Sequence, residues 1–310
     1  MAARTVQGMP IDVDLLRLLR AVQDEGSISA AARRLGISQP AASQQLRRAE
    51  RAIGTALVER TGRTSRPTDP GRVLARHAVA VENLLAAAER EVLAVAGLAA
   101  GTVRLVAFPS ASARLVPRAL ARLRRGSPGL RVALAEMEPP GSLDLLRRGD
   151  ADVVVTFDHV VAGHSVPTDL DGLSVVALLD DEVRVAVPEV RPWARDARVR
   201  MAELGDEEWI AGCPRCRGHL VDLAAAAGFV PRIRYETDDY VAVLGLVAED
   251  LGVALVPSLA QGPRDVPGVA TVSLDPVARR RVVAVTTPDL ARVPGVAAVL
   301  DALRLTAEAA

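Results

Sequence analysis

The segment GSISAAARRLGISQPAASQQLRRAERAIG, residues 26–54, decides the fold of the N-terminal part of the chain. Ser29 is placed to cap a short helix, and Gly36 suits the left-handed backbone that follows such a helix. Ser38 is placed to cap the next helix, and Pro40 falls in its first turn, where a missing N–H does no harm. Two helices joined by a tight, glycine-containing turn predict a helix-turn-helix.

The second of these helices has an apolar and a polar face when its residues are spaced by about 100°. The apolar stripe consists of Ala42, Leu46, Ala49 and Ile53. The polar face carries Gln39, Pro40, Ser43, Gln44, Arg47, Arg48 and Arg51. A glutamine amide can pair with adenine, a serine hydroxyl can donate or accept a hydrogen bond, and an arginine guanidinium can pair with guanine or phosphate. We interpret this face as a DNA-reading surface, and a solvated helix of an unrelated bundle is the alternative.

The charge distribution favours a DNA partner. The 310-residue chain has no net charge, but residues 1–70 carry 11 Arg and 7 acidic residues, a net charge of +4. Residues 33–66 alone contain 8 Arg and 2 Glu. A basic module joined to a mildly acidic remainder predicts a polyanion partner for the N-terminal part.

The segment TALVERTGRTSRPTDPG, residues 55–71, has the turn residues and spaced charges of a β-hairpin. Arg60, Arg63 and Arg66 recur every three residues along it. Such a wing would place arginine on phosphates or in an adjacent minor groove. A solvated arginine-rich loop is the alternative.

Residues 15–71 resemble the winged helix-turn-helix of LysR-type transcriptional regulators. The shared pattern is AA..L..SQPA.S.Q...E...G..L..R..R....T..G. The resemblance implies recognition-helix roles for Gln39, Pro40, Ser43, Gln44 and Arg47, and a wing contact by Arg63. Ser38, Arg48 and Arg66 complete the expected set of DNA contacts. The chain has Gln44, Val58 and Pro67 where Arg, Phe and Leu are usual, and the first difference predicts a different base preference.

Residues 70–98 predict one long helix, because no proline follows Pro70 in this range. A seam with alternating spacings of four and three consists of Val73, His77, Ala80, Leu84, Ala87, Glu91 and Ala94. A helix of about 25 residues spans roughly 38 Å, more than one small module buries. We expect it to pair with the same helix of a second subunit, giving a homodimer or a homotetramer. Packing on its own C-terminal domain is the alternative.

From Gly101 onward, short apolar strands alternate with helices, which predicts α/β structure. A helix with Pro117 near its start follows the first strand, and the pattern starts again near residue 175. It closes with strands near 269–274 and 281–286 and a helix from about Val293. The expected fold class is α plus α/β: a winged helix-turn-helix (1–69), a linker helix (70–98) and a two-lobed domain (99–310). Lobe I covers about 99–173 and 276–310, and lobe II about 174–275.

Ligands of such folds bind at the C-terminal ends of strands, in a cleft between lobes. This part also resembles the effector domain of LysR-type regulators, which is similar to periplasmic binding proteins. Hydroxyls of Ser110 and Ser112 at a helix N-terminus then suit an anion such as a carboxylate, and a plain helix cap is the alternative. The expected effector site comprises Ser110, Ala111, Ser112, Thr156, Gly212, Cys213, Thr237, Asp238 and Tyr240.

The motif CPRC, Cys213 to Cys216, is compatible with a redox pair or with an ordinary loop of the cleft. Two cysteines exclude a four-cysteine zinc site, and His159 and His164 lie far away in sequence, which leaves only His219 nearby. We therefore expect neither a metal nor another cofactor. A redox-responsive regulator acting through Cys213 and Cys216 is kept as an alternative.

These patterns predict a cytoplasmic, DNA-binding transcriptional regulator that a small-molecule effector controls. The start MAARTVQGMP lacks the apolar run of a secretory signal, the apolar runs are too short for a membrane span, and two cysteines fit a reducing compartment. No G-x-S-x-G, G-x-x-x-x-G-K-[ST] or H-E-x-x-H motif occurs, which argues against an enzyme. The rival hypothesis is an α/β enzyme or ligand-binding protein whose N-terminal helices serve assembly. Expected partners are double-stranded DNA, the effector and a second copy of the chain, without a membrane.

Overall fold

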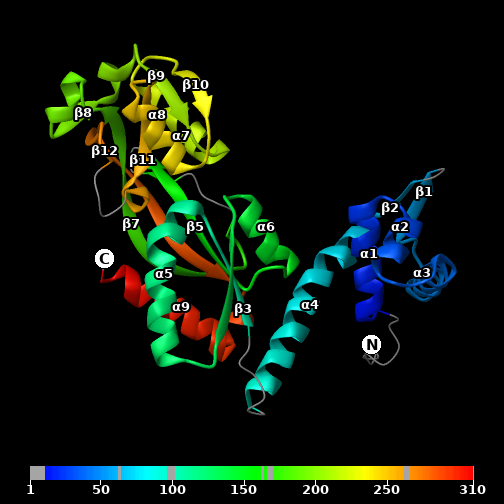
Figure 1. The fold of residues 1–310 in the computed structure, drawn as a ribbon. Coiled ribbons are helices and arrows are strands. Elements are labelled where there is room, and N and C mark those ends of the chain that lie inside the picture. Colours follow the sequence, from blue (N-terminus) through cyan, green and yellow to red (C-terminus); the bar gives the residue numbers. More distant parts are fainter. Residues whose placement is uncertain are drawn as a thin grey trace. The chain divides into compact units, whose positions relative to one another are not determined.

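A computed structural model describes residues 11–61, 64–95, 102–161, 164–165, 170–261 and 266–309. The chain divides into two compact units, Met1–Glu89 and Arg90–Ala310 (Figure 1). The first unit is helical apart from one hairpin, and the second is built on one large sheet. None of the helices in the described ranges is both long and apolar enough to cross a membrane.

The N-terminal unit is a winged helix-turn-helix that leads into a long helix, drawn in blue to cyan in Figure 1. Leu18 of the first helix and Ala31 of the second are fully buried in one apolar cluster, which Leu57 joins at the start of the wing. The stripe predicted on the third helix is confirmed, since Ala42, Leu46 and Ala49 are buried and Ile53 packs against them. The elements are α1 Val13–Glu25, α2 Ile28–Arg34, α3 Gln39–Ile53, β1 Val58–Thr61, β2 Thr64–Pro67 and α4 Asp69–Val95.

The predicted cap and turn of the recognition helix are confirmed. Ser38 Oγ accepts a hydrogen bond from the Ala41 N–H over 3.3 Å, and Gly36 has the expected left-handed backbone with φ 69°. The expected cap of α2 is wrong by two residues. Ser27, rather than Ser29, caps this helix by accepting from the Ala30 N–H over 3.2 Å. The earlier start places Ile28 in the apolar core, where it is 5% exposed.

The long helix α4 has 27 residues, close to the predicted length, which corresponds to about 40 Å. Its first part belongs to the core of the N-terminal unit, because Ala75 and Ala78 are buried. Other large apolar side chains of α4 remain exposed. They are Val73 at 42% near its start and, farther along, Leu84 at 53%, Leu85 at 43% and Val92 at 67% exposure.

The C-terminal unit has the alternating strands and helices that the sequence predicts (Figure 1). Its first half contains β3 Thr102–Ala107, α5 Pro109–Gly126, β4 Arg131–Glu136, α6 Gly141–Arg148, β5 Val153–Val161 and β6 His164–Ser165. Then follow β7 Ser174–Pro188, η1 Pro192–Arg195, β8 Arg198–Arg200, η2 Met201–Leu204, β9 Glu208–Ala211 and α7 Pro214–Ala226. The chain ends with β10 Arg232–Glu236, α8 Tyr240–Ala248, β11 Val253–Pro257, η3 Ser258–Ala260, β12 Val269–Thr286, η4 Leu290–Arg292 and α9 Pro294–Ala307.

One sheet with the strand order β10-β9-β11-β7-β12-β5-β3-β4 runs through the whole unit. Parallel pairing of β3 with β4 and β5 forms one half, and parallel pairing of β9 with β10 and β11 forms the other. The long strands β7 and β12 pair antiparallel and connect the two halves. The strands β7 and β12 thus run between the two halves of one continuous sheet.

Two details of the C-terminal prediction are wrong. The strands expected near 269–274 and 281–286 are one strand, because β12 continues past a register shift between Ser273 and Ala278 and keeps its pairing with β7. The helix expected to have Pro117 near its start begins at Pro109, so that Pro117 lies inside α5. The closing helix, predicted from about Val293, is confirmed as α9.

Candidate functional site

The recognition helix α3 presents a mixed row of amide and guanidinium groups. Gln39, Gln44 and Arg47 are exposed in the isolated chain. Ser38, Pro40 and Arg48 of the expected set are exposed as well. Amide and guanidinium groups on an unobstructed helix face are what base edges and phosphates require.

Ser43 departs from the predicted face, because it is buried at 4% exposure. Its Oγ accepts a hydrogen bond from Gln39 Nε2 over 3.0 Å. The serine therefore orients the side-chain amide of Gln39 and does not present its own hydroxyl to solvent. Helical spacing puts Ser43 among the polar residues, between Gln39 and Arg47 around the helix, and packing in the folded unit buries it nonetheless.

Glu50 fixes the wing to the end of α3. Its Oε1 accepts from the backbone N–H of Leu57 over 2.9 Å and of Val58 over 3.2 Å. The wing is further held by the Ser65 N–H, which donates to the Gly26 carbonyl over 2.8 Å. The role of Glu50 was not predicted, although a lone acid in a basic helix was a usable signal.

The wing is the expected antiparallel hairpin, in which Glu59 lies opposite Arg66 and Arg60 lies opposite Ser65. Arg60 and Arg66 are both exposed. Arg63, the expected wing contact, lies outside the described residues. The hairpin thus offers two described guanidinium groups at one end of α3.

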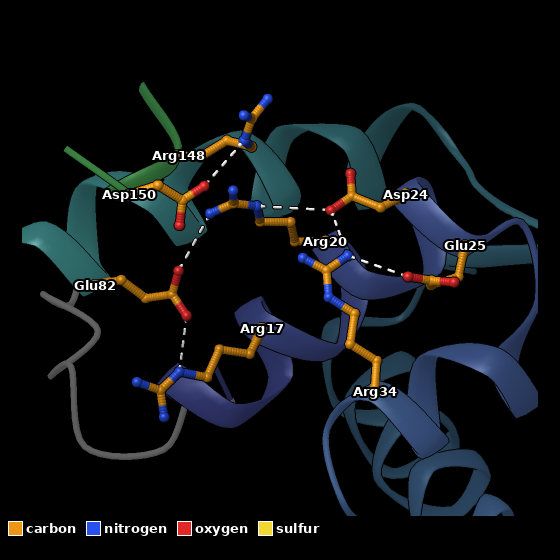
Figure 2. A network of polar contacts seen from close by, with 8 residues as sticks. All are labelled: Arg17, Arg20, Asp24, Glu25, Arg34, Glu82, Arg148 and Asp150. Carbon is orange, nitrogen blue, oxygen red and sulfur yellow. Dashed lines mark hydrogen bonds and ion pairs between the residues drawn. The ribbon is translucent and has the colours of Figure 1, made fainter. Parts of the chain in front are cut away.

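A network of ion pairs keeps several other arginines of the unit engaged (Figure 2). Glu82 of α4 accepts from Arg17 Nε over 2.8 Å and from Arg20 Nη1 over 3.2 Å, which ties α4 to α1. Arg34 pairs with Asp24 over 2.9 Å, and this hydrogen bond raises its pKa above the ordinary value. These arginines stabilise the unit. On α3, Arg48 lies 4.0 Å from Asp12 and Arg51 donates to the Arg47 carbonyl over 3.2 Å, whereas the exposed side chains of Arg47, Arg60 and Arg66 project from α3 and the wing.

The expected effector residues of the first half do not line the cavities that the second half forms. Ser110 and Ala111 are buried, and Ser110 Oγ accepts from Arg280 Nη2 over 2.7 Å. Ser112 Oγ lies 3.5 Å from the Ala107 carbonyl, and buried Thr156 has no hydrogen-bond partner for its hydroxyl in the described structure. Neither serine caps α5, since Phe108 occupies the N-cap position without a side-chain bond. The hydroxyl of Ser110 is therefore engaged inside the protein.

The expected residues of the second half do come together. Gly212, Cys213, Thr237, Asp238 and Tyr240 line a cavity of about 20 Å³, together with Glu138 of the first half. A neighbouring cavity of about 10 Å³ is lined by residues that include His159, His219 and Arg280. Each has room for about one water molecule, so the cleft between the halves is closed in this conformation.

Arg280 occupies the centre of this region and was not predicted. Its guanidinium pairs with Asp181 over 2.7 Å, and both side chains are 2% exposed. It also lies 4.8 Å from the ring centre of Phe108 and 4.6 Å from that of Phe157. Two aromatic faces and a carboxylate thus compensate a charge that burial alone would make unfavourable.

His159 and His219 stack on one another with ring centres 3.9 Å apart and planes 9° apart. Burial lowers the pKa of His219 to about 4. Burial, together with the positive charges of His219 and Arg280, lowers the pKa of His159 to about 2. In the described structure neither ring nitrogen of either residue has a hydrogen-bond partner. The expectation that only His219 is near the cysteines needs correction, since the fold places His159 beside it. No group of three side chains suited to a metal occurs among the described residues.

Cys213 and Cys216 are free thiols with their sulfur atoms 3.1 Å apart. Cys213 is the N-cap of α7, and its Sγ accepts from the Cys216 N–H over 3.4 Å. The Cys216 thiol and backbone N–H lower the pKa of Cys213 to about 6, and the pKa of Cys216 is raised. Burial, with the charge of Cys213, raises the pKa of Glu138 to about 8.

Two family models match the chain. Residues 13–72 match the bacterial regulatory helix-turn-helix of the lysR family, and residues 96–307 match the LysR substrate binding domain. The chain belongs to the LysR family of transcriptional regulators. As a LysR-family regulator it combines a DNA-binding helix-turn-helix with an effector-binding domain.

Relatives agree with this assignment over nearly the whole chain. The probable HTH-type transcriptional regulator LrrA of Synechococcus elongatus is 30% identical over 96% of this chain and 98% of its own. The small neutral protease regulatory protein of Streptomyces lividans is 34% identical over 91% of this chain and 80% of its own. These comparisons do not favour the alternatives of a redox-responsive regulator, an enzyme or a ligand-binding protein with assembly helices.

Solved LysR-family structures share the fold. Full-length OxyR from Pseudomonas aeruginosa has a TM-score of 0.65 at 19% identity, covering 95% of each chain. Full-length CbnR in complex with its target DNA has a TM-score of 0.57 at 21% identity, covering 96% of this chain and 100% of that one.

Proposed function

We propose that this LysR-family regulator reads its operator through the exposed face of α3. The observation that carries the proposal is the row of Gln39, Gln44 and Arg47, which no other described part of the N-terminal unit covers. Gln39 and Gln44 are assigned to base edges, with Ser43 holding Gln39 in place. Arg47, Arg48 and Pro40 approach the backbone of the DNA, and Ser38 lies at the helix N-terminus, where phosphate is favoured.

Arg66 and Arg63 of the wing are proposed to contact phosphates or an adjacent minor groove. Arg66 is exposed on β2, and Arg63 precedes this strand in the sequence. A wing held by Glu50 and Gly26 keeps a fixed position beside α3. Its contacts therefore add affinity and register, and α3 supplies base preference.

The chain is proposed to act as a homodimer through α4, with a tetramer as a further assembly. Leu84, Leu85 and Val92 are exposed in the isolated chain, and an apolar seam of this kind is stabilised by a partner helix. Two linked copies of α3 then read two half-sites. The bonds from Arg17 and Arg20 to Glu82 hold α4 against α1. The arrangement of the two α4 helices in the dimer would therefore determine the spacing of the two recognition helices.

The effector is proposed to bind between the two halves of the C-terminal unit. Glu138 from one half and Gly212, Cys213, Thr237, Asp238 and Tyr240 from the other already meet there. The small cavities require the halves to separate before a molecule enters, and closure on it would then reorient them. A small molecule such as a carboxylate fits the N–H groups at the start of α7 and the hydroxyls beside them. Ser110, Ala111, Ser112 and Thr156 are proposed to form the other wall, and Ser110 Oγ accepts from Arg280 Nη2.

We further propose that the protein works in the cytoplasm and carries no catalytic activity, as the family assignment supports. The test of the whole proposal is a gel shift with DNA flanking its own gene, at several salt concentrations. Binding that weakens steeply as salt rises is expected, because Arg–phosphate contacts release counterions. Lack of any shift at low ionic strength, with folded protein, would contradict it.

A further inference from the structure

The two cysteines of the chain meet at the start of α7. Their sulfur atoms are 3.1 Å apart, and neither cysteine is in a disulfide. Cys213 is the N-cap of the helix, and the backbone N–H of Cys216 in its first turn donates to Cys213 Sγ over 3.4 Å. A helix N-terminus stabilises negative charge beside it. The fold therefore places two sulfur donors where one ion can contact both and where thiolates are stabilised.

Two imidazoles border the same place. His159 of β5 and His219 of α7 line, together with Cys216, the cavity of about 10 Å³. The two histidines are 9% and 3% exposed, and no ring nitrogen of either has a hydrogen-bond partner within the described part of the chain. Buried polar groups without a partner are rare and call for an explanation such as a bound water or ion. Imidazole is the commonest metal ligand among side chains, so the cavity holds unused donors next to a thiol.

The identity of these donors selects the kind of ion. Sulfur and imidazole nitrogen favour Cu(I) or Zn(II) over the magnesium and calcium ions that oxygen ligands hold. A structural zinc ion needs four ligands, and the described residues contain no group of three or more side chains suited to a metal. Cu(I) is softer and forms stable complexes with two thiolates alone. The paired sulfurs of Cys213 and Cys216 therefore fit Cu(I) better than Zn(II).

The surroundings also suit the charge of such a complex, since one Cu(I) ion with two thiolates carries a single net negative charge. The N-terminus of α7 stabilises this charge, and the guanidinium of Arg280 lines the cavity beside Cys216. We propose that Cys213 Sγ and Cys216 Sγ bind one Cu(I) ion at the start of α7. Each thiol that carries a proton releases it to solvent, and no electron is transferred. This site needs only the start of α7, so it goes beyond the proposed binding of DNA and of an organic effector.

The test uses the full chain, reduced and kept free of oxygen, with Cu(I) as the probe and the coloured chelator bicinchoninate as the competitor. Cys213→Ser and Cys216→Ser each remove one sulfur at nearly constant side-chain size. Val221→Ser is the matched control, because Val221 is partly exposed on the same helix and lines neither small cavity. Zn(II) with a zinc indicator is the ion control. Circular dichroism checks that each variant is folded.

We expect the wild type and Val221→Ser to withdraw one Cu(I) ion per chain from the chelator. Each cysteine variant should bind Cu(I) at least about a hundredfold more weakly, since loss of an outer-shell partner alone costs up to about that much. Zn(II) should bind far more weakly than Cu(I).

A second readout needs no variant: one equivalent of Cu(I) should protect both thiols of the wild type from N-ethylmaleimide. Failure of the folded wild type to withdraw Cu(I), or equal withdrawal by the cysteine variants, would overturn the proposal. Loss of both thiols to a disulfide, with no copper retained, would overturn it as well.

Discussion

Arg280 of β12 and Asp181 of β7 form a buried ion pair 2.7 Å long at the centre of the C-terminal unit. Their strands are the two that connect both halves of the sheet. Arg280 also reaches Ser110 of α5, so one guanidinium joins three elements. A movement of one half of the sheet relative to the other would therefore change the contacts of this ion pair.

Arg280→Ala is expected to destabilise the C-terminal unit by about 3–5 kcal/mol, because it leaves the buried carboxylate of Asp181 without its cation. Urea unfolding followed by tryptophan fluorescence measures this, since both tryptophans, Trp193 and Trp209, lie in this unit. The matched control is Arg281→Ala, whose exposed pair with Asp180 is worth about 0–1 kcal/mol. Equal losses for the two variants would contradict the assigned role.

His219 is expected to make the unit sensitive to acid. Its pKa is about 4 in the folded chain and about 6.5 when unfolded, so the unfolded state binds more protons between these values. Its contribution is complete above about pH 6.5 and is lost as pH falls toward 4, by up to about 3 kcal/mol. Urea unfolding across this range in wild type and His219→Gln measures the difference. Parallel pH profiles would show that His219 does not titrate as described.

Cys213 is expected to ionise at unusually low pH. Its pKa of about 6, against an ordinary value of about 8.5, predicts a thiolate absorbance that appears with a midpoint near pH 6. Cys216→Ser should shift this midpoint, because it replaces the thiol whose hydrogen bond with Cys213 lowers the pKa of Cys213. Cys213→Ser should abolish the transition. A wild-type midpoint above pH 8 would contradict the cap geometry at α7.

Leu84→Glu and Val92→Glu are expected to convert the proposed homodimer to monomer, since both would place a charge in the apolar seam of α4. Sedimentation velocity at several protein concentrations measures the change. Val190→Glu is the control, because Val190 is 80% exposed outside α4. An unchanged sedimentation coefficient in both α4 variants would place the dimer interface elsewhere.

Sequence signals between neighbouring residues predicted most of the secondary structure of the N-terminal unit. The Ser38 cap, the Gly36 turn and the apolar stripe of α3 all depend on neighbours in sequence, and the structure has each of them. The two errors there, the helix cap expected at Ser29 and the exposure expected for Ser43, arise from packing. Ile28 and the side of α3 near Ser43 are covered by other helices, which a single helical wheel does not show.

The interior of the C-terminal unit was harder to predict, because its contacts join distant parts of the chain. Arg280 belongs to the run ARRR, which sequence alone favours as a solvated strand face, yet it is buried against Asp181, 99 residues away. His159 meets His219 only through the sheet. By contrast, the resemblance to the LysR-type effector domain implied that the segments around Cys213 and Tyr240 face one cleft, and both line a common cavity.

The central claim, that α3 reads DNA, is tested most directly by fluorescence anisotropy on operator and scrambled DNA across salt concentrations. Gln39→Ala is predicted to weaken operator binding by about 1–3 kcal/mol and to leave scrambled DNA almost unaffected. Arg47→Ala should weaken binding to both DNAs, with a salt slope shallower by about 1 for each phosphate that the variant no longer neutralises. Equal losses of affinity on the two DNAs for Gln39→Ala would contradict the claim.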